Sequence, residues 1–283
     1  MLLAHTGAVP TAAKEVRKER RFMVFDFFEH KTPKRATFHR DSSSLSWGCT
    51  LRNTPRRYEK PAGQREIRTE FGLMLSRALL QQARLYGILD LGYVQPSAIA
   101  QVTKALCVGG VDLLQLRAKG KSPTHIERWA GEMLPITRSY NVPLIINDHP
   151  EVAAKVGCEG VHVGQEDDSI ARAREWVGPD VWIGKSTHSL SQALAAQEEG
   201  PDYIGFGPLY ATGTKPDYTP VGLADVPAVH AQIRLPIFCI GGVNLTRIQE
   251  IVQAGACRVV AVSALLLAAK IEDETRRLKA ALP

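Results

Sequence analysis

Eight short apolar segments recur along the chain after residue 84, and this recurrence constrains the fold more than any other feature. We expect them to be strands, at residues 85–89, 113–117, 144–147, 160–163, 181–184, 203–206, 237–240 and 259–262. Segments of helical period or composition alternate with them, at residues 96–107, 126–140, 151–156, 169–176, 190–199, 225–232, 245–254 and 264–281. Apolar strands joined by helical crossovers form a parallel sheet that is covered on both faces.

Eight such units in about 200 residues predict an α/β fold, a closed (β/α)8 TIM barrel. An open doubly wound sheet is the structural alternative. That fold would usually place a GxGxxG turn after its first strand, and no such turn follows Leu89. In a barrel, the site is expected where strands end and the following loops begin.

The first 73 residues differ from the rest in composition. They hold 15 Lys and Arg against 8 Asp and Glu, whereas the remaining residues are close to neutral. The segment is polar and broken by Pro, Ser and Gly, so we predict a disordered extension over residues 1–73 and a catalytic barrel over 74–283. A regulatory tail, a nucleic-acid-binding arm and an extension without a role, with Met74 as an alternative start, are the interpretations left open. Because the basic excess lies outside the barrel, we expect no nucleic-acid partner.

The cysteines show no CxxC pair and no metal-ligand spacing with histidine; they are Cys49, Cys107, Cys158, Cys239 and Cys257. An odd, scattered set favours reduced thiols and a cytoplasmic protein. No run of about 18 apolar residues occurs, so we expect no membrane partner.

The second expected strand ends in the sequence LLQLRAKG. Gln115, Arg117 and Lys119 are two residues apart, so an extended chain places them on one face, with Leu113 below them. Burying two cations at a barrel mouth costs free energy unless an anion pairs with them. Arginine and lysine together suit a diphosphate. The alternative is a solvated polar turn.

Two carboxylates follow the third and fourth strands, Asp148 in INDHP and Asp167 in HVGQEDD. Converging beside two cations, they predict a Mg²⁺ site completed by water and substrate phosphate. Asn147 offers an amide to a heterocycle or a phosphate. Each aspartate could instead cap the helix that follows it.

His162 lies at the end of the fourth expected strand, and His188 follows the fifth. His162 invites a general-base role, but a packed or hydrogen-bonded histidine is favoured. His188 is similar, and Ser186 beside it is the better ligand candidate. No GxSxG nucleophile elbow occurs, so no Ser/His/Asp triad is expected.

The last three strands end in small and hydroxyl residues. The loop after the sixth strand offers Thr212, Gly213, Thr214 and the cation Lys215. A glycine pair after the seventh strand and a small residue opening the last helix form a common barrel phosphate site. Its expected backbone donors are Gly242, Val262 and Ser263. These residues therefore predict two phosphate-binding sites at the barrel mouth, one for a diphosphate near strands two to four and one for a monophosphate near strands six to eight.

This ordered set resembles the thiamine phosphate synthase family. The motifs are QLRAK (115–119), ND (147–148), HVGQED (162–167), GKSTH (184–188), GPLYATGTK (207–215), IGGV (240–243) and VS (262–263). The likeness spans about residues 84–281. One departure is the first strand, LYGILD, where the family commonly reads LYxITD.

The resemblance implies a Mg²⁺-dependent transferase that joins 4-amino-5-hydroxymethyl-2-methylpyrimidine diphosphate to thiazole phosphate by a dissociative reaction. It implies that the pyrimidine diphosphate is held by Gln115, Leu116, Arg117, Ala118, Lys119, Asn147, Ser186 and Lys215. Of these, it makes Arg117, Lys119, Ser186 and Lys215 catalytic. It assigns Mg²⁺ to Asp148 and Asp167. It assigns the thiazole phosphate to Thr212, Gly213, Thr214, Gly242, Val262 and Ser263.

Two other functions stay open. A thiazole tautomerase would share the barrel and the thiazole-phosphate site but would not handle the diphosphate. A non-catalytic phosphate-ligand sensor would use the basic extension to bind nucleic acid, although no recognition motif supports it. The partners we expect are small-molecule substrates, with a homo-oligomer as an option.

Overall fold

The computed structural model describes residues 37–40, 47–50, 78–213 and 219–283. Eight parallel strands close into a barrel in the order β10-β3-β4-β5-β6-β7-β8-β9. They are β3 (Leu85–Asp90), β4 (Leu113–Arg117), β5 (Leu144–Asn147), β6 (Gly160–Val163), β7 (Trp182–Thr187), β8 (Tyr203–Phe206), β9 (Ile237–Ile240) and β10 (Val259–Ala261). The ring closes where Val259 of β10 pairs with Leu85 of β3. The predicted TIM barrel is confirmed, and the open sheet is wrong.

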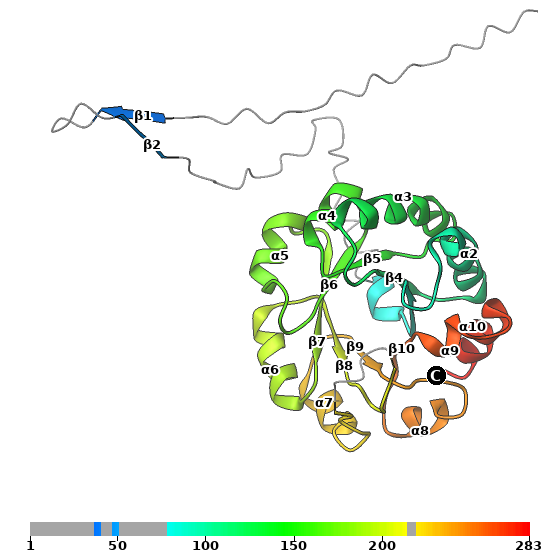
Figure 1. Cartoon of the computed structure of the whole chain (residues 1–283). Coiled ribbons are helices and arrows are strands. Elements are labelled where there is room, and N and C mark those ends of the chain that lie inside the picture. The colour runs from blue at the N-terminus through cyan, green and yellow to red at the C-terminus, as the bar shows by residue number, and fades with distance from the viewer. Residues whose placement is uncertain (1–36, 41–46, 51–77, 214–218) are drawn as a thin grey trace, which may run out of the picture. The chain divides into compact units, whose positions relative to one another are not determined.

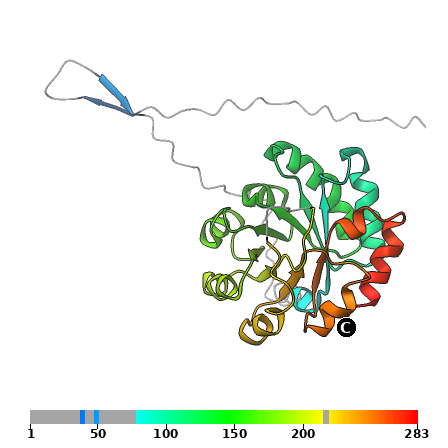
Figure 2. The same ribbon diagram turned by 60° about the horizontal axis from the view of Figure 1, so that its bottom comes forward.

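Helices surround the strands on the outside (Figures 1 and 2). They are η1 (Pro96–Ala98), α2 (Ile99–Gly109), α3 (Pro123–Ser139), α4 (Pro150–Val156), α5 (Ile170–Val177), α6 (Leu190–Glu199), α7 (Val226–Gln232), α8 (Ile248–Gln253), α9 (Ser263–Leu266) and α10 (Ile271–Ala280). Among the residues described, none of the helices has both the length and the apolar character needed to cross a bilayer.

Two differences from the expected bounds bear on the site and on the last helix. The single helix expected over 264–281 is two helices, α9 and α10, separated by a turn in which Leu267 is 67% exposed. Strand β7 continues to Thr187, three residues beyond its expected end, because Lys185, Ser186 and Thr187 pair with β8. The polar residues of GKSTH therefore belong to the strand itself.

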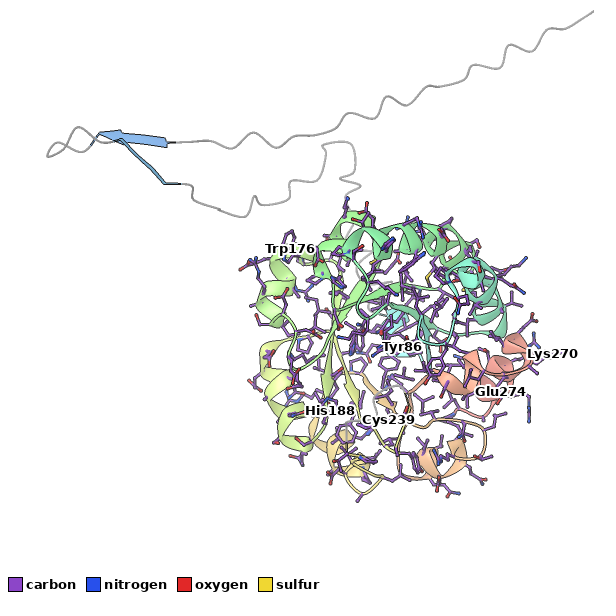
Figure 3. All side chains as sticks on the ribbon, viewed as in Figure 1. Tyr86, Trp176, His188, Cys239, Lys270 and Glu274 are labelled. Carbon is purple, nitrogen blue, oxygen red and sulfur yellow. The ribbon has the colours of Figure 1, made fainter. Side chains whose placement is uncertain are left out.

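The core has two layers. One lies between strands and helices and includes Leu85, Leu89 and Leu116. The other fills the barrel interior, where the rings of Tyr86, Tyr203 and Phe238 meet edge to face with centroids 5.5 to 6.0 Å apart. Figure 3 places Tyr86 near the centre of the ring of strands and Trp176, Lys270 and Glu274 on its periphery. The interior is thus a packed floor beneath the carboxyl ends of the strands.

Within the extension, strands β1 (Thr37–Arg40) and β2 (Trp47–Thr50) pair antiparallel, with Thr37 opposite Thr50. The sequence predicted no strand here, because four-residue strands are too short to show a periodic pattern. The other residues of 1–73, for which we expect disorder, lie outside the described residues. Met1–Arg56 and Arg57–Pro283 form separate compact units.

Candidate active site

A cavity opens at the carboxyl ends of the barrel strands, and every strand contributes to its lining. Eight of the residues proposed from the sequence line it: Gln115, Arg117, Asn147, Ser186, Thr212, Gly242, Val262 and Ser263. They come from both halves of the ring, which places Arg117 and the polar side chains of β4 to β7 across from a glycine-rich side on β8 to β10.

Strand β4 presents alternate side chains to this cavity. Gln115 is buried and Arg117 is partly buried, and both line the cavity above Leu113 of the interior layer, as the spacing predicted. Leu116 and Ala118 are buried in the outer layer, because odd and even positions of a strand face opposite sides. Their side chains therefore do not reach the cavity, and only their backbone groups are left for the binding role proposed for them.

Arg117 is held by a carboxylate that the sequence analysis did not select. Asp90, at the end of β3, is 3% exposed; its Oδ2 accepts a hydrogen bond from Arg117 Nη1 at 2.6 Å. Its Oδ1 accepts from the Gly92 amide at 2.8 Å. Counting by twos from Tyr86 would have identified Asp90 as the last inward-facing residue of its strand.

The two proposed metal ligands lie together beside Lys119. Asp148 forms an ion pair with Lys119 and is within hydrogen-bonding reach of Asp167. Burial, then the hydrogen bond and negative charge of Asp167, raise the pKa of Asp148, while Lys119 opposes the rise. Asp167 Oδ2 also accepts from the Gly164 amide at 2.7 Å. Two carboxylates thus converge at the edge of the cavity, not within its lining.

Neither aspartate caps a helix, so the helix-cap alternative is wrong for both. The N-cap of α4 is His149, without a side-chain cap, and that of α5 is Ser169, whose hydroxyl accepts from the Arg172 amide at 3.2 Å. Asp148 has a φ of 62°, a left-handed conformation that costs a non-glycine residue free energy. Strain of this kind concentrates at functional sites.

His162 is hydrogen-bonded on both sides. Its Nδ1 lies 3.2 Å from the Tyr203 hydroxyl and its Nε2 lies 3.0 Å from Ser186 Oγ. The packed, hydrogen-bonded histidine favoured from the sequence describes this geometry. His188 also lines the cavity, and its Nδ1 contacts the carbonyl of Gly207.

The opposite side of the cavity is built from glycine. Gly241 and Gly242 follow β9 with φ of 104° and 69°, and a Cβ on either would collide with the loop after β8. Tyr210 and Arg247, which the sequence analysis missed, flank Gly242. The guanidinium of Arg247 lies 4.3 Å from the Tyr210 ring centroid and donates to the Gly242 carbonyl at 3.2 Å.

The loop after β8 is described only in part. Thr212 lines the cavity and Gly213 is exposed beside it. Thr214 and Lys215 lie outside the described residues, so their proposed roles stay predictions. Within the described ranges, no group of three or more His, Cys, Asp or Glu gathers where it could hold a metal ion.

Fold and site together define a class of proteins, the (β/α)8 barrels with a ligand site at the carboxyl ends of the strands. One side of this site carries charged side chains, and the other is built from glycine backbone. A sequence model of the family "Thiamine monophosphate synthase" matches residues 85–265. The chain belongs to this family of transferases in thiamine biosynthesis.

Similar proteins agree with this assignment. A thiamine-phosphate synthase of Chloroflexus aurantiacus is 39% identical over 207 residues, covering 73% of this chain and 95% of that protein. One of Shouchella clausii is 35% identical over 200 residues, covering 70% and 96%. The solved thiamine phosphate pyrophosphorylase of Pyrococcus furiosus superposes with a TM-score of 0.66 at 27% identity, covering 72% of this chain and 96% of that one. A 3-hexulose-6-phosphate synthase, 16% identical with a TM-score of 0.54, shares the fold.

Proposed function

We propose that the chain joins 4-amino-5-hydroxymethyl-2-methylpyrimidine diphosphate to thiazole phosphate, giving thiamine phosphate and diphosphate. One observation carries the proposal. A single cavity is lined by Arg117 and Ser186 on one side and by Gly242 and Ser263 on the other. Two phosphate-bearing substrates can therefore meet over one interior floor.

The diphosphate belongs on the β4 side. The fork of Arg117 N–H groups can meet two phosphate oxygens, and its bond to Asp90 fixes the direction of that fork. Gln115, Asn147 and Ser186 add uncharged donors and acceptors for the pyrimidine. Lys119 and Lys215 are proposed to add positive charge at the rim.

Asp148 and Asp167 suit Mg²⁺ as the cofactor. Their carboxylates converge, and the pKa of Asp148 is raised by burial and then by the hydrogen bond and negative charge of Asp167; a divalent cation would relieve the repulsion between the two charges. Two carboxylates leave most of the coordination shell to water and phosphate, which is the usual arrangement for Mg²⁺. When bound, the ion would neutralise charge on the diphosphate.

The thiazole phosphate belongs on the β8 to β10 side. Gly242, Val262 and Ser263 line the cavity, and the absence of a Cβ at Gly242 allows an anion to approach backbone N–H groups closely. Thr212, with Gly213 and Thr214, would add hydroxyl and amide donors. This partition leaves the thiazole nitrogen facing the pyrimidine.

The proposed reaction is dissociative. The bond between the pyrimidine methylene carbon and the diphosphate oxygen breaks, and its electron pair leaves with the diphosphate. The aminopyrimidine stabilises the resulting cation, and the thiazole nitrogen lone pair then forms the new C–N bond. Arg117 and Lys119 act on charge that develops on the leaving group, so they stabilise the transition state more than the ground state.

Incubating the protein with both substrates and Mg²⁺ tests the proposal. Thiamine phosphate and diphosphate should form in equal amounts, and neither should form when one substrate is omitted. A thiazole tautomerase would convert only the thiazole, and a ligand sensor would bind without any product. Either of those results would replace the proposed function.

The cellular setting is also a proposal. Cys107, Cys158 and Cys239 are buried free thiols and Cys257 is an exposed one. Thiols of this kind are compatible with the cytoplasm, where we place the protein. A homo-oligomer stays a prediction.

A further inference from the structure

Five side chains from five strands form an unbroken row of hydrogen bonds across the barrel interior. Gln115 Nε2 donates to the Tyr86 hydroxyl at 2.7 Å, and the hydroxyls of Tyr86 and Tyr203 lie 3.0 Å apart. The Tyr203 hydroxyl lies 3.2 Å from His162 Nδ1, and His162 Nε2 lies 3.0 Å from Ser186 Oγ. All five line the cavity. We call this row the Gln115–Ser186 chain.

The first three members are almost fully buried, and this fixes their protonation. Gln115, Tyr86 and Tyr203 are 2%, 1% and 0% exposed. Burial raises the pKa of both phenols far above their usual range, so each keeps its proton. Each tyrosine therefore has one hydrogen to donate.

The direction of the chain follows from its first bond. Because Gln115 donates to Tyr86, the Tyr86 hydrogen is available for Tyr203, and the Tyr203 hydrogen for His162 Nδ1. A neutral imidazole that accepts at Nδ1 carries its proton on Nε2 and donates it to Ser186 Oγ. The reverse direction would leave the Tyr86 hydroxyl hydrogen without an acceptor among the described residues, at the cost of a buried unsatisfied donor.

We propose that the Gln115–Ser186 chain fixes Ser186 as a hydrogen-bond donor toward the pyrimidine diphosphate. Ser186 accepts from His162, so its own hydrogen is directed to the cavity. Tyr86 and Tyr203 are positioning residues that act through His162. The ligand group recognised is a hydrogen-bond acceptor, either a ring nitrogen or a diphosphate oxygen. The inference rests on the proposed function for the identity of this ligand.

The tautomer of His162 tests the chain without any turnover. The ¹⁵N shifts and couplings of the imidazole should show a neutral ring with its proton on Nε2. Gln115→Glu replaces the first donor with a carboxyl group, which cannot donate a hydrogen bond once it is ionised. The ¹³C shift of the new carboxyl shows the pH at which it is ionised. At that pH the chain should reverse and the proton should move to Nδ1. A wild-type proton on Nδ1, or an unchanged tautomer in the ionised variant, overturns the proposal.

Kinetics test the role of the phenols. Tyr203→Phe removes one link, and kcat/KM for the pyrimidine diphosphate should fall about tenfold, while the Kd of thiazole phosphate stays within about twofold. Tyr140→Phe, which removes a phenolic hydroxyl from the surface after α3, is the control and should change neither kcat/KM nor Kd. If Tyr203→Phe does not fold, Tyr86→Phe interrupts the same chain one bond earlier. No loss, or equal loss for both substrates, overturns the proposal.

Binding of fragments identifies the acceptor. Ser186→Ala should weaken binding of the hydroxymethylpyrimidine if the acceptor is a ring nitrogen, or of inorganic diphosphate with Mg²⁺ if it is a phosphate oxygen. If neither fragment is weakened, Ser186 is not the donor. Absence of coupling in the wild type would refute the proposed function alone, because the tautomer measurement would still stand.

Discussion

At the scale of single residues, the site depends on one buried carboxylate. Asp90 neutralises Arg117 and orients it, since its two oxygens bind Arg117 and the backbone of the following loop. A buried guanidinium without this partner would keep its charge but lose its direction. We therefore propose that Asp90 acts on the diphosphate through Arg117.

Asp90→Asn should lower kcat/KM for the pyrimidine diphosphate about tenfold, because the amide keeps the shape of the side chain and removes its charge. Steady-state kinetics at saturating thiazole phosphate measure this. Asp112→Asn, at an ion pair with Lys279 outside the cavity, is the matched control. An unchanged or higher kcat/KM for Asp90→Asn would show that Arg117 is positioned by other groups.

Asp167→Asn should abolish most Mg²⁺-dependent turnover, a loss of about a hundredfold or more. It should also raise the Tm of the metal-free protein, because it removes a negative charge beside Asp148, whose pKa is raised by burial and then by its contact with Asp167. Asp168→Asn, one residue along and exposed, is the control. Thermal melts with Mg²⁺ and with EDTA should show a metal-dependent rise in Tm for wild type and control only. A full Mg²⁺ response in Asp167→Asn would contradict the assignment.

The same pair predicts the sign of a pH effect. The raised pKa of Asp148 means that the metal-free native state holds its proton to a higher pH than an ordinary aspartate. Mg²⁺ needs the ionised form, so its affinity should be lost on acidification at a higher pH than the usual aspartate range. Metal titrations across the acidic range measure this, and a loss confined to the usual range would contradict it.

Residue spacing predicted part of the site. Positions 115 and 117 face the cavity because strand geometry alone decides parity. Asp90, Tyr86 and Tyr203 were missed: strand parity could have placed Asp90 facing inward, but an aspartate or tyrosine in an apolar strand does not show which side chain lies across the barrel from it. Their contacts come from strands far apart in sequence, such as Tyr86 and Tyr203.

At the scale of elements, the strands could be predicted more closely than the helices. Seven of the eight expected strands end within one residue of the observed bounds, because the apolar runs end where the buried strands end. The break between α9 and α10 was missed because residues 264–281 have helix-forming composition throughout. The turn between them follows from tertiary packing of α10 against α2, not from local preference.

The loop after β9 offers an element-scale test. Gly241→Ala should destabilise the protein by about 3 kcal/mol or more, because its Cβ would lie 2.5 Å from Pro208 Cβ and its φ is 104°. It should also weaken thiazole phosphate binding, because the loop after β9, which carries the proposed donor Gly242, must move. Gly200→Ala is the matched control, with a left-handed φ of 78° and ψ of 42° and no atom within 4 Å of the added Cβ, and should cost only about 1 kcal/mol. Equal losses of stability in chemical denaturation would contradict this account of the loop.

At the scale of the whole molecule, the barrel is complete without the basic extension. The ring of strands closes between β10 and β3, and helical residues 78–82 contribute Leu80 to the interior layer. We predict that a chain beginning at Met74 folds and turns over at the rate of the full chain. Thermal melts and coupling rates of the two chains check this. A large loss of activity or solubility would assign the extension a role in the barrel.

We propose that one barrel mouth binds two phosphate-bearing substrates on opposite sides. Arg117→Ala tests it most directly when thiazole phosphate affinity and coupling rate are measured on the same preparation, with Arg128→Ala on the exposed face of α3 as the control. We predict that the coupling rate of Arg117→Ala falls about a hundredfold, which corresponds to roughly 3 kcal/mol of transition-state stabilisation. The affinity for thiazole phosphate should be nearly unchanged. Loss of both to the same extent, or of neither, would contradict it.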